Sequence, residues 1–239
     1  MRIGAPLLAL CAWTSSTPAA ESRTIEHKTT LAELFPANEV TALARTLPAD
    51  RVVTFRVRAP GNGSADAVFI FVAANDSGEL PDAWTSVMDE KRLMWIAANG
   101  YGNTRLSAER VLVALMAVRL AERLLPPQAR RLYVAGYSGG GRVASRCITL
   151  FASYFDGALF NSGADFVKPP EPAATLMKSR RMVFLTGSGD FNRREMKSVA
   201  GRYGKAGVTE LLLMDEPGLA HELATPEQLA RAIDFLEAR

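Results

Sequence analysis

A serine flanked by glycines is the residue of this sequence best placed to act as a nucleophile. Residues 136–140, Gly-Tyr-Ser-Gly-Gly, follow an apolar run at 131–135 and precede a helical pattern that begins at Gly139. A strand, a tight turn and a helix in this order form a nucleophile elbow, in which a strained turn exposes the serine hydroxyl above a sheet. The backbone N–H of Gly139, at the start of the helix, can stabilise a negatively charged oxygen there. We therefore predict Ser138 as a nucleophile for acyl transfer and Gly139 as one oxyanion donor.

A glycine-rich turn before a helix could instead bind a phosphate group. The phosphate-binding loop of nucleotide-binding proteins requires a lysine followed by serine or threonine, and this sequence has Arg142 and Val143 at those positions. The nucleophile elbow is therefore the better interpretation of this motif.

Two histidines are available as the base that must activate the serine. His27 lies near the N-terminus, in a polar stretch where we predict no strand. His221 comes after a predicted strand at 209–214, in a loop at 215–221 that leads into the final helix. In a parallel sheet with helices on both faces, ligand sites lie beyond the carboxyl ends of the strands. His221 is therefore the predicted general base.

A carboxylate should orient the imidazole and stabilise its charged form. Asp190 ends a glycine-rich loop that directly follows a predicted strand, and Asp165 follows the strand before it. The acidic pair at 215–216 is closer to His221 in sequence, but its side chains would have to turn back from the strand to reach the imidazole. The chain order Ser138, Asp190, His221 is the order of a known hydrolase triad. We predict Asp190 as the orienting acid, with Asp165 as the alternative.

The spacing of apolar residues predicts the elements that position these side chains. Residues 52–58 alternate apolar and polar side chains, which predicts an antiparallel edge strand. The regular alternation of strands and helices after them favours a parallel sheet with helices on both faces. The last helix is marked by a capping box of Thr225 and Gln228 with Pro226 in the first turn. Further strands are expected at 67–73, 93–97, 131–135, 157–160, 182–185 and 209–214, and further helices at 107–125, 139–150 and 193–203.

Composition sets limits on the class of protein. The chain has 239 residues, of which 48% are hydrophobic and 22% charged, so it is long enough for one domain with a substantial core. It has 28 basic and 25 acidic residues, and no run of Lys and Arg with interleaved aromatic residues. These features argue against nucleic-acid binding. No apolar run is long enough to insert stably across a membrane.

The N-terminus has the pattern of a secretory signal peptide. Arg2 is followed by a nearly continuous apolar run at 3–13, and small residues at 17–20 precede Glu21. We predict a signal peptide at residues 1–20 and a secreted or periplasmic protein; the alternative is a buried N-terminal helix. Residues 21–50 are expected to pack on the domain, with one short helix at 38–45, and residues 51–239 to form the catalytic domain. After cleavage Cys147 would be the single cysteine, with no partner for a disulfide in the same chain.

The elbow and the order of the three side chains resemble the α/β-hydrolase superfamily, from about residue 52 to the C-terminus. Residues 72–78, 99–103 and 138–141 are most similar to small secreted esterases of the polyhydroxybutyrate-depolymerase kind. The resemblance implies an α/β-hydrolase fold and a second oxyanion N–H in the loop after Val72. Many relatives carry His-Gly there, whereas this chain has Ala-Ala-Asn at 73–75. We assign the second donor to Asn75, and its backbone N–H does not depend on the side chain.

These residues together predict the hydrolysis of a small or polymeric carboxylic ester through an acyl-enzyme. A serine peptidase of the same fold is the first alternative, although such peptidases often carry an added propeller or a large cap for which this chain has no room. A non-catalytic binding module is the second. No metal or other cofactor is expected, since no Cys/His cluster has ligand spacing. No sizeable lid is expected either, because the stretch at 161–181 is short and contains Pro169, Pro170 and Pro172.

Overall fold

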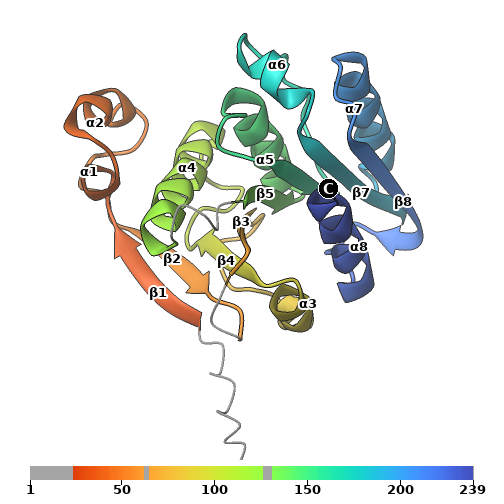
Figure 1. Cartoon of the computed structure of the whole chain (residues 1–239), viewed down its shortest axis with the longest axis horizontal. Helices are drawn as coiled ribbons and strands as arrows, with labels where there is room; N and C mark the ends of the chain where they lie inside the picture. Colours follow the sequence, from red (N-terminus) through yellow and green to blue (C-terminus); the bar gives the residue numbers. More distant parts are fainter. Residues whose placement is uncertain (1–23, 62–64, 126–130, 239) are drawn as a thin grey trace, which may run out of the picture.

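An eight-stranded sheet forms the centre of the molecule. The computed structural model describes residues 24–61, 65–125 and 131–238, and the predicted signal peptide at 1–20 lies outside them. The strand order is β1-β2-β4-β3-β5-β6-β7-β8 (Figure 1). Strands β3 to β8 pair in parallel, while β1 with β2 and β2 with β4 pair antiparallel. The strands are β1 (Thr24–Thr29), β2 (Val53–Arg58), β3 (Ala67–Val72), β4 (Leu93–Ala98), β5 (Arg131–Tyr137), β6 (Gly157–Asn161), β7 (Arg181–Gly189) and β8 (Leu211–Ala220).

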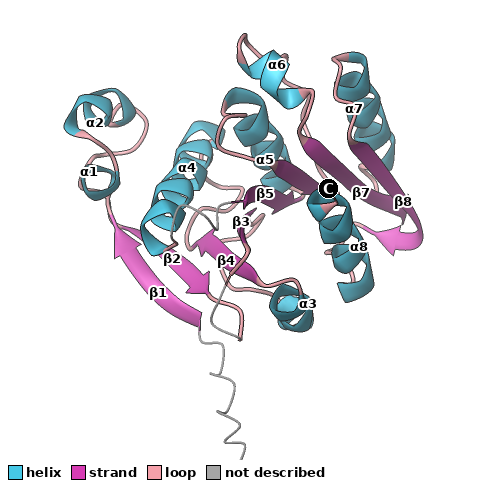
Figure 2. Cartoon of the chain, in the orientation of Figure 1, coloured by secondary structure: helices cyan, strands magenta, loops and turns pink. Residues whose placement is uncertain are grey.

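Helices cover both faces of this sheet, as the sequence predicted. Helices α4, α5 and α7 lie on one face and α3 and α8 on the other (Figure 2). Successive residues of the central strands serve different cores: Phe69 packs with α3 and Ile70 with α4. The helices are α1 (Leu31–Leu34), α2 (Ala37–Leu43), α3 (Thr85–Glu90), α4 (Ser107–Leu124), α5 (Gly139–Leu150), α6 (Ala173–Met177), α7 (Arg193–Lys205) and α8 (Pro226–Glu237), with a 3₁₀ turn η1 at Asp82–Trp84.

The N-terminal segment differs from the sequence prediction. We expected 52–58 to be an edge strand and His27 to lie outside any strand, but β1 contains His27 and covers β2, with His27 opposite Phe55. Backbone hydrogen bonds to β2 hold β1 in place, and Thr29 is its one buried residue. A strand held mainly by its backbone leaves little apolar pattern to detect. The short helix expected at 38–45 is present as α2, beginning one residue earlier and ending two earlier.

Strands β7 and β8 extend beyond their apolar segments. We expected residues 215–220 to be a loop, but pairing continues from Thr186 and Asp215 to Gly189 and Ala220, with one irregularity near Gly187. The added residues are mostly polar or glycine, so the sequence did not mark them as strand. Because Gly189 pairs with Ala220, the residues that follow them, at 190 and 221, leave the sheet side by side.

The connection between β6 and β7 contains no long lid. The short helix α6 is its one helix, and it has five residues. This agrees with the expectation from the three prolines of the segment. No helix in the described parts of the chain is long and apolar enough to cross a membrane.

Candidate active site

The turn between β5 and α5 has the geometry of a nucleophile elbow. Ser138 stands at the N-cap of α5 with φ 54° and ψ −121°, a backbone conformation that side chains with a Cβ rarely adopt. Its N–H donates to the carbonyl of Asn161 at 2.8 Å, which ties the turn to the end of β6. A Cβ on Gly136 or Gly140 would overlap the neighbouring backbone, so the turn requires glycine on both sides. The strain and the crowding fix the position of the Ser138 hydroxyl.

The three side chains predicted from the sequence meet at this turn. The His221 Nε2 atom lies 2.9 Å from the Ser138 hydroxyl oxygen. On the other side of the ring, His221 Nδ1 lies 2.8 Å from an Asp190 carboxylate oxygen. With the proton on Nδ1, the ring donates to Asp190 and its Nε2 accepts from the serine hydroxyl. The arrangement therefore lets the imidazole take the serine proton while the carboxylate stabilises the resulting charge.

Asp190 is held as an ionised acceptor. Its side chain is fully buried, and burial alone would raise the pKa of the carboxyl. The hydroxyl of Thr186 donates to one carboxylate oxygen at 2.7 Å, and the backbone N–H of Asn192 donates to the other at 2.9 Å. Together with the bond from His221, these donors outweigh burial and lower the pKa of Asp190. The carboxylate thus remains charged and faces the imidazole.

The histidine loop is anchored by residues that the sequence did not single out. The Tyr137 hydroxyl donates to the His221 carbonyl at 2.7 Å. The buried side chain of Asn161 donates to the Glu222 carbonyl at 3.0 Å and accepts from the Ala224 N–H at 2.8 Å. The positions of these residues could have suggested them, since Tyr137 directly precedes the serine and Asn161 ends the neighbouring strand. They hold the loop from the sheet side.

An aromatic ring packs against the imidazole of His221. Phe191 stacks on His221, with 3.9 Å between ring centroids and 25° between planes. Its side chain is nevertheless 77% exposed. Phe191 therefore covers one face of the imidazole while its own ring remains largely exposed to solvent.

The alternative acids are occupied elsewhere. Asp165 accepts from Arg146 at 2.7 Å and from Arg142 at 3.1 Å. The carboxylate of Asp215 is bound by Arg193, at 2.8 Å from Nε. The neighbouring Glu216 pairs with Arg231 on α8. None of these carboxylates contacts His221, so Asp190 is the acid that the structure places at the ring.

Comparison with solved structures shows which fold this is. An esterase from Pyrococcus furiosus is similar to this chain with a TM-score of 0.60 and 16% identity, over 99% of this chain and 97% of that one. The chain has the α/β-hydrolase fold. Acyl-protein thioesterase 2 from Zea mays matches with a TM-score of 0.59 and 15% identity, over 77% and 97% of the two chains. An S-formylglutathione hydrolase from Staphylococcus aureus matches with a TM-score of 0.60 and 14% identity, over 90% of this chain and 97% of that one. No protein-family model and no curated protein matches the sequence.

In α/β-hydrolases the second oxyanion N–H comes from the loop that follows strand β3, which pairs with the strand before the elbow. Here that loop follows β3 and contains Asn75, which is exposed. The Asn75 side chain accepts from the Ser77 N–H at 3.2 Å, so it is used within its own turn. Within the described residues, no hydrogen bond uses the backbone N–H of Asn75 or of Gly139. A Cβ on Gly140 would overlap the Val72 carbonyl, which shows how closely this loop and the elbow approach.

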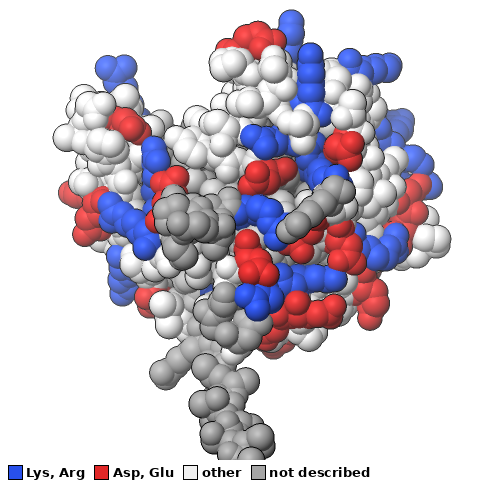
Figure 3. Space-filling model, viewed as in Figure 1, with Lys and Arg blue, Asp and Glu red and all other residues white. Residues whose placement is uncertain are grey.

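Outside this site, the described residues contain neither a cluster of metal ligands nor an exposed thiol. On the face shown in Figure 3, Lys and Arg side chains are interspersed with Asp and Glu side chains. Among the described residues, no group of three His, Cys, Asp or Glu side chains is arranged to hold a metal ion. The buried thiol of Cys147, whose pKa burial raises to about 12, lies in α5 away from solvent. It is therefore a core residue rather than a second nucleophile.

Proposed function

We propose that this protein is a serine hydrolase that cleaves carboxylic esters through an acyl-enzyme intermediate. The observation that carries the proposal is the pair of short contacts at His221, 2.9 Å to the Ser138 hydroxyl and 2.8 Å to Asp190. The strained backbone of Ser138 supports it, because such strain concentrates at functional sites. The α/β-hydrolase fold of esterases and thioesterases with similar structures supports it further.

The reaction follows from this geometry in two halves. The Ser138 oxygen attacks the ester carbonyl carbon while His221 Nε2 takes the hydroxyl proton, and the carbonyl electrons move to the oxygen. The N–H groups of Gly139 and Asn75 bind that oxyanion. When the C=O bond reforms, the alcohol leaves with the proton from His221, and the acyl group remains on the serine. Water then attacks this ester with His221 again as base, which releases the acid and restores the serine.

The proposed substrates are small esters or the ester groups of a polymer. The absence of a long lid between β6 and β7 leaves no cover of the kind that closes over a lipid. The thioesterase and the S-formylglutathione hydrolase among the similar structures make thioesters reasonable members of the test panel. Aminoacyl amides belong in the panel as well, because a peptidase of this fold would use the same three residues.

The experiment that tests the proposal measures turnover of aryl esters, thioesters and aminoacyl amides, with acyl chains of increasing length, by the protein and by Ser138→Ala. We expect hydrolysis of short-acyl esters, reduced on the order of 10⁶-fold in Ser138→Ala. Cleavage of aminoacyl amides with a kcat/KM comparable to that for matched esters would identify a peptidase instead, since an esterase leaves amides almost uncleaved. A folded protein that cleaves none of these, or a Ser138→Ala variant as active as the parent, would overturn the proposal.

We also propose that the protein is exported. The support is the pattern of residues 1–20, with its basic start, apolar segment and small residues before Glu21. Expression of the full chain in a bacterium, followed by fractionation and N-terminal sequencing, tests this. We expect the protein outside the cytoplasm with Glu21 at its N-terminus. A cytoplasmic protein that keeps Met1 would contradict export without affecting the proposed chemistry.

A further inference from the structure

A buried arginine lies directly behind the proposed oxyanion site. Arg110 projects from the first turn of α4 and is 4% exposed. Among the described residues, the hydrogen bonds of its guanidinium go to neutral oxygens and not to a carboxylate. Burial lowers the pKa of its guanidinium, and the charge of Asp76 opposes this shift. Arginine nevertheless remains protonated in proteins, so a full positive charge is buried here.

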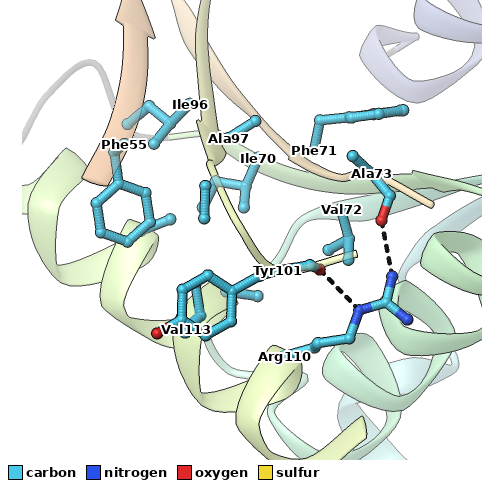
Figure 4. Close-up of a pocket in the computed structure, with 13 residues that line it drawn as sticks. Phe55, Ile70, Phe71, Val72, Ala73, Ile96, Ala97, Tyr101, Arg110 and Val113 are labelled. Carbon is cyan, nitrogen blue, oxygen red and sulfur yellow. Dashed lines mark hydrogen bonds between the residues drawn. The ribbon is translucent and has the colours of Figure 1, made fainter. Parts of the chain in front are cut away.

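The guanidinium is satisfied by neutral oxygens from three separate segments. Nη2 donates to the Ala73 carbonyl at 2.7 Å, and Nε donates to the Tyr101 carbonyl at 3.0 Å (Figure 4). Nη1 donates to the Asn103 side-chain oxygen at 3.1 Å and to the Gly139 carbonyl at 3.4 Å. The planar fork of an arginine holds several acceptors in a fixed relation, which a lysine cannot do.

Two of these segments supply the proposed oxyanion donors. The Gly139 carbonyl belongs to the residue whose N–H is the first donor, and the Ala73 carbonyl lies two residues before Asn75 in the loop of the second. The segment at 99–103 connects them: the Asn103 N–H donates to the Ala74 carbonyl at 2.8 Å, and the Asn103 side chain lies against Gly139, where a Cβ would overlap it. Arg110 is thus the one side chain in the described structure that bonds to both donor segments and to the loop between them.

The cavity beside Arg110 is small and lined mainly by apolar side chains. Figure 4 shows Arg110 beside this cavity, together with lining side chains such as Ile70 and Val113. The cavity volume is about 20 Å³, which is too small for an acyl group. Burying a charge without a carboxylate partner opposes folding. An apolar side chain would avoid that cost but would leave the carbonyls of Ala73 and Tyr101 without this donor. The contribution of Arg110 therefore lies in the segments that it connects rather than in the space that it fills.

We propose that Arg110 is a positioning residue of the oxyanion site. Its fork fixes the distance between the Gly139 and Asn75 N–H groups before the substrate arrives. Its charge, in surroundings of low polarity, also favours negative charge on the carbonyl oxygen as the tetrahedral intermediate forms. This inference rests on the proposed function. Arg110 then stabilises the transition state and contributes little to the binding of the substrate.

The test compares Arg110→Lys with a matched control, Arg58→Lys. Arg58 is also 4% exposed, but it pairs with Asp89 at 2.7 Å and lies on β2, opposite Trp95 of β4. For an aryl ester, we expect Arg110→Lys to lower kcat by about 10²-fold, the effect of losing one oxyanion donor, with KM within about threefold. Its affinity for a trifluoromethyl ketone, which forms a tetrahedral adduct with the serine, should fall by a similar factor. Arg58→Lys should leave all three quantities within about threefold.

A second variant keeps the test decisive if Arg110→Lys does not fold. Asn103→Ala removes one acceptor of the fork and its contact with Gly139, and leaves the arginine in place. We expect kcat to fall about tenfold with KM unchanged. The inference is overturned if folded Arg110→Lys keeps the kcat of the parent, or if its KM rises while its kcat is unchanged. It is also overturned if Asn103→Ala has the kcat of the parent. If the parent protein itself hydrolyses none of the esters, the result counts against the proposed function and not against this inference alone.

Discussion

Replacing Ser138 by glycine or by alanine separates the strain of the elbow from the chemistry of its hydroxyl. Both variants lack the oxygen that would attack the substrate, so neither should hydrolyse esters. They differ in the Cβ that alanine keeps at φ 54° and ψ −121°. Glycine adopts that conformation freely, whereas alanine does not. The two variants should therefore be equally inactive and unequally stable.

The size of the difference follows from two opposing effects. A residue with a Cβ in such a sparsely populated region costs about 1–3 kcal/mol. Glycine in turn loses more backbone freedom on folding, by roughly 0.4–1 kcal/mol relative to alanine. Because the backbone strain outweighs the loss of freedom, we expect Ser138→Gly to exceed Ser138→Ala in free energy of unfolding by about 1 kcal/mol. For a domain of this size that corresponds to a difference in Tm of about 2–4 °C.

Urea unfolding of both variants measures this difference, and Ser145 provides the control. Ser145 lies inside α5 and is buried, so Ser145→Gly should be less stable than Ser145→Ala by about 1 kcal/mol. The order of the two variants should thus reverse between the two sites. If Ser138→Gly is no more stable than Ser138→Ala, the elbow is not strained in solution and the argument from its backbone fails.

Three further predictions test the parts around the serine. Asp190→Asn should lower kcat by about 10⁴-fold, because it would hold the imidazole in the wrong tautomer, while Asp165→Asn should stay within about tenfold; the reverse ranking in ester hydrolysis would show that the acid had been assigned to the wrong strand. The pKa of Asp190 is lowered in the folded protein, so its contribution to stability is present above the unfolded value of about 3.9 and is lost as the pH falls through the folded value. Urea unfolding between about pH 5 and pH 2 should therefore show a smaller loss of stability in Asp190→Asn than in the parent, and equal losses would mean that the carboxylate is not stabilised. Without a long lid, the rate on an ester should rise smoothly across its solubility limit, whereas a sharp increase at the interface would reveal a mobile cover.

The candidate site could be predicted from the sequence because the elbow and the strand ends that carry its side chains have strict local requirements. The elbow needs small residues on both sides of the serine, and these glycines mark it in the sequence. Ser138, Asp190 and His221 each follow the end of a strand, and a parallel sheet brings such ends together at one edge. The final helix was equally clear, since the capping box of Thr225 is present as predicted. Local chemistry and strand order were sufficient for these features.

What could not be predicted depends on contacts between distant segments. The outer strand β1 is polar, and it is defined by its pairing with β2 rather than by its own side chains. The ends of β7 and β8 carry glycine and polar residues, so only the register shows that they are strand. Arg110 resembles a surface residue of an amphipathic helix. It is buried because the loop after β3, the loop after β4 and the start of α5 surround it, and nothing in the sequence of α4 indicates their positions.

Covalent labelling by a fluorophosphonate, with the modified residue identified by peptide mass spectrometry, tests directly whether Ser138 is the nucleophile. We expect one adduct per chain, on Ser138, with labelling abolished in Ser138→Ala and strongly slowed in His221→Ala. A properly folded protein that is not labelled, or an adduct on a different serine, would contradict the assignment of Ser138 as the nucleophile.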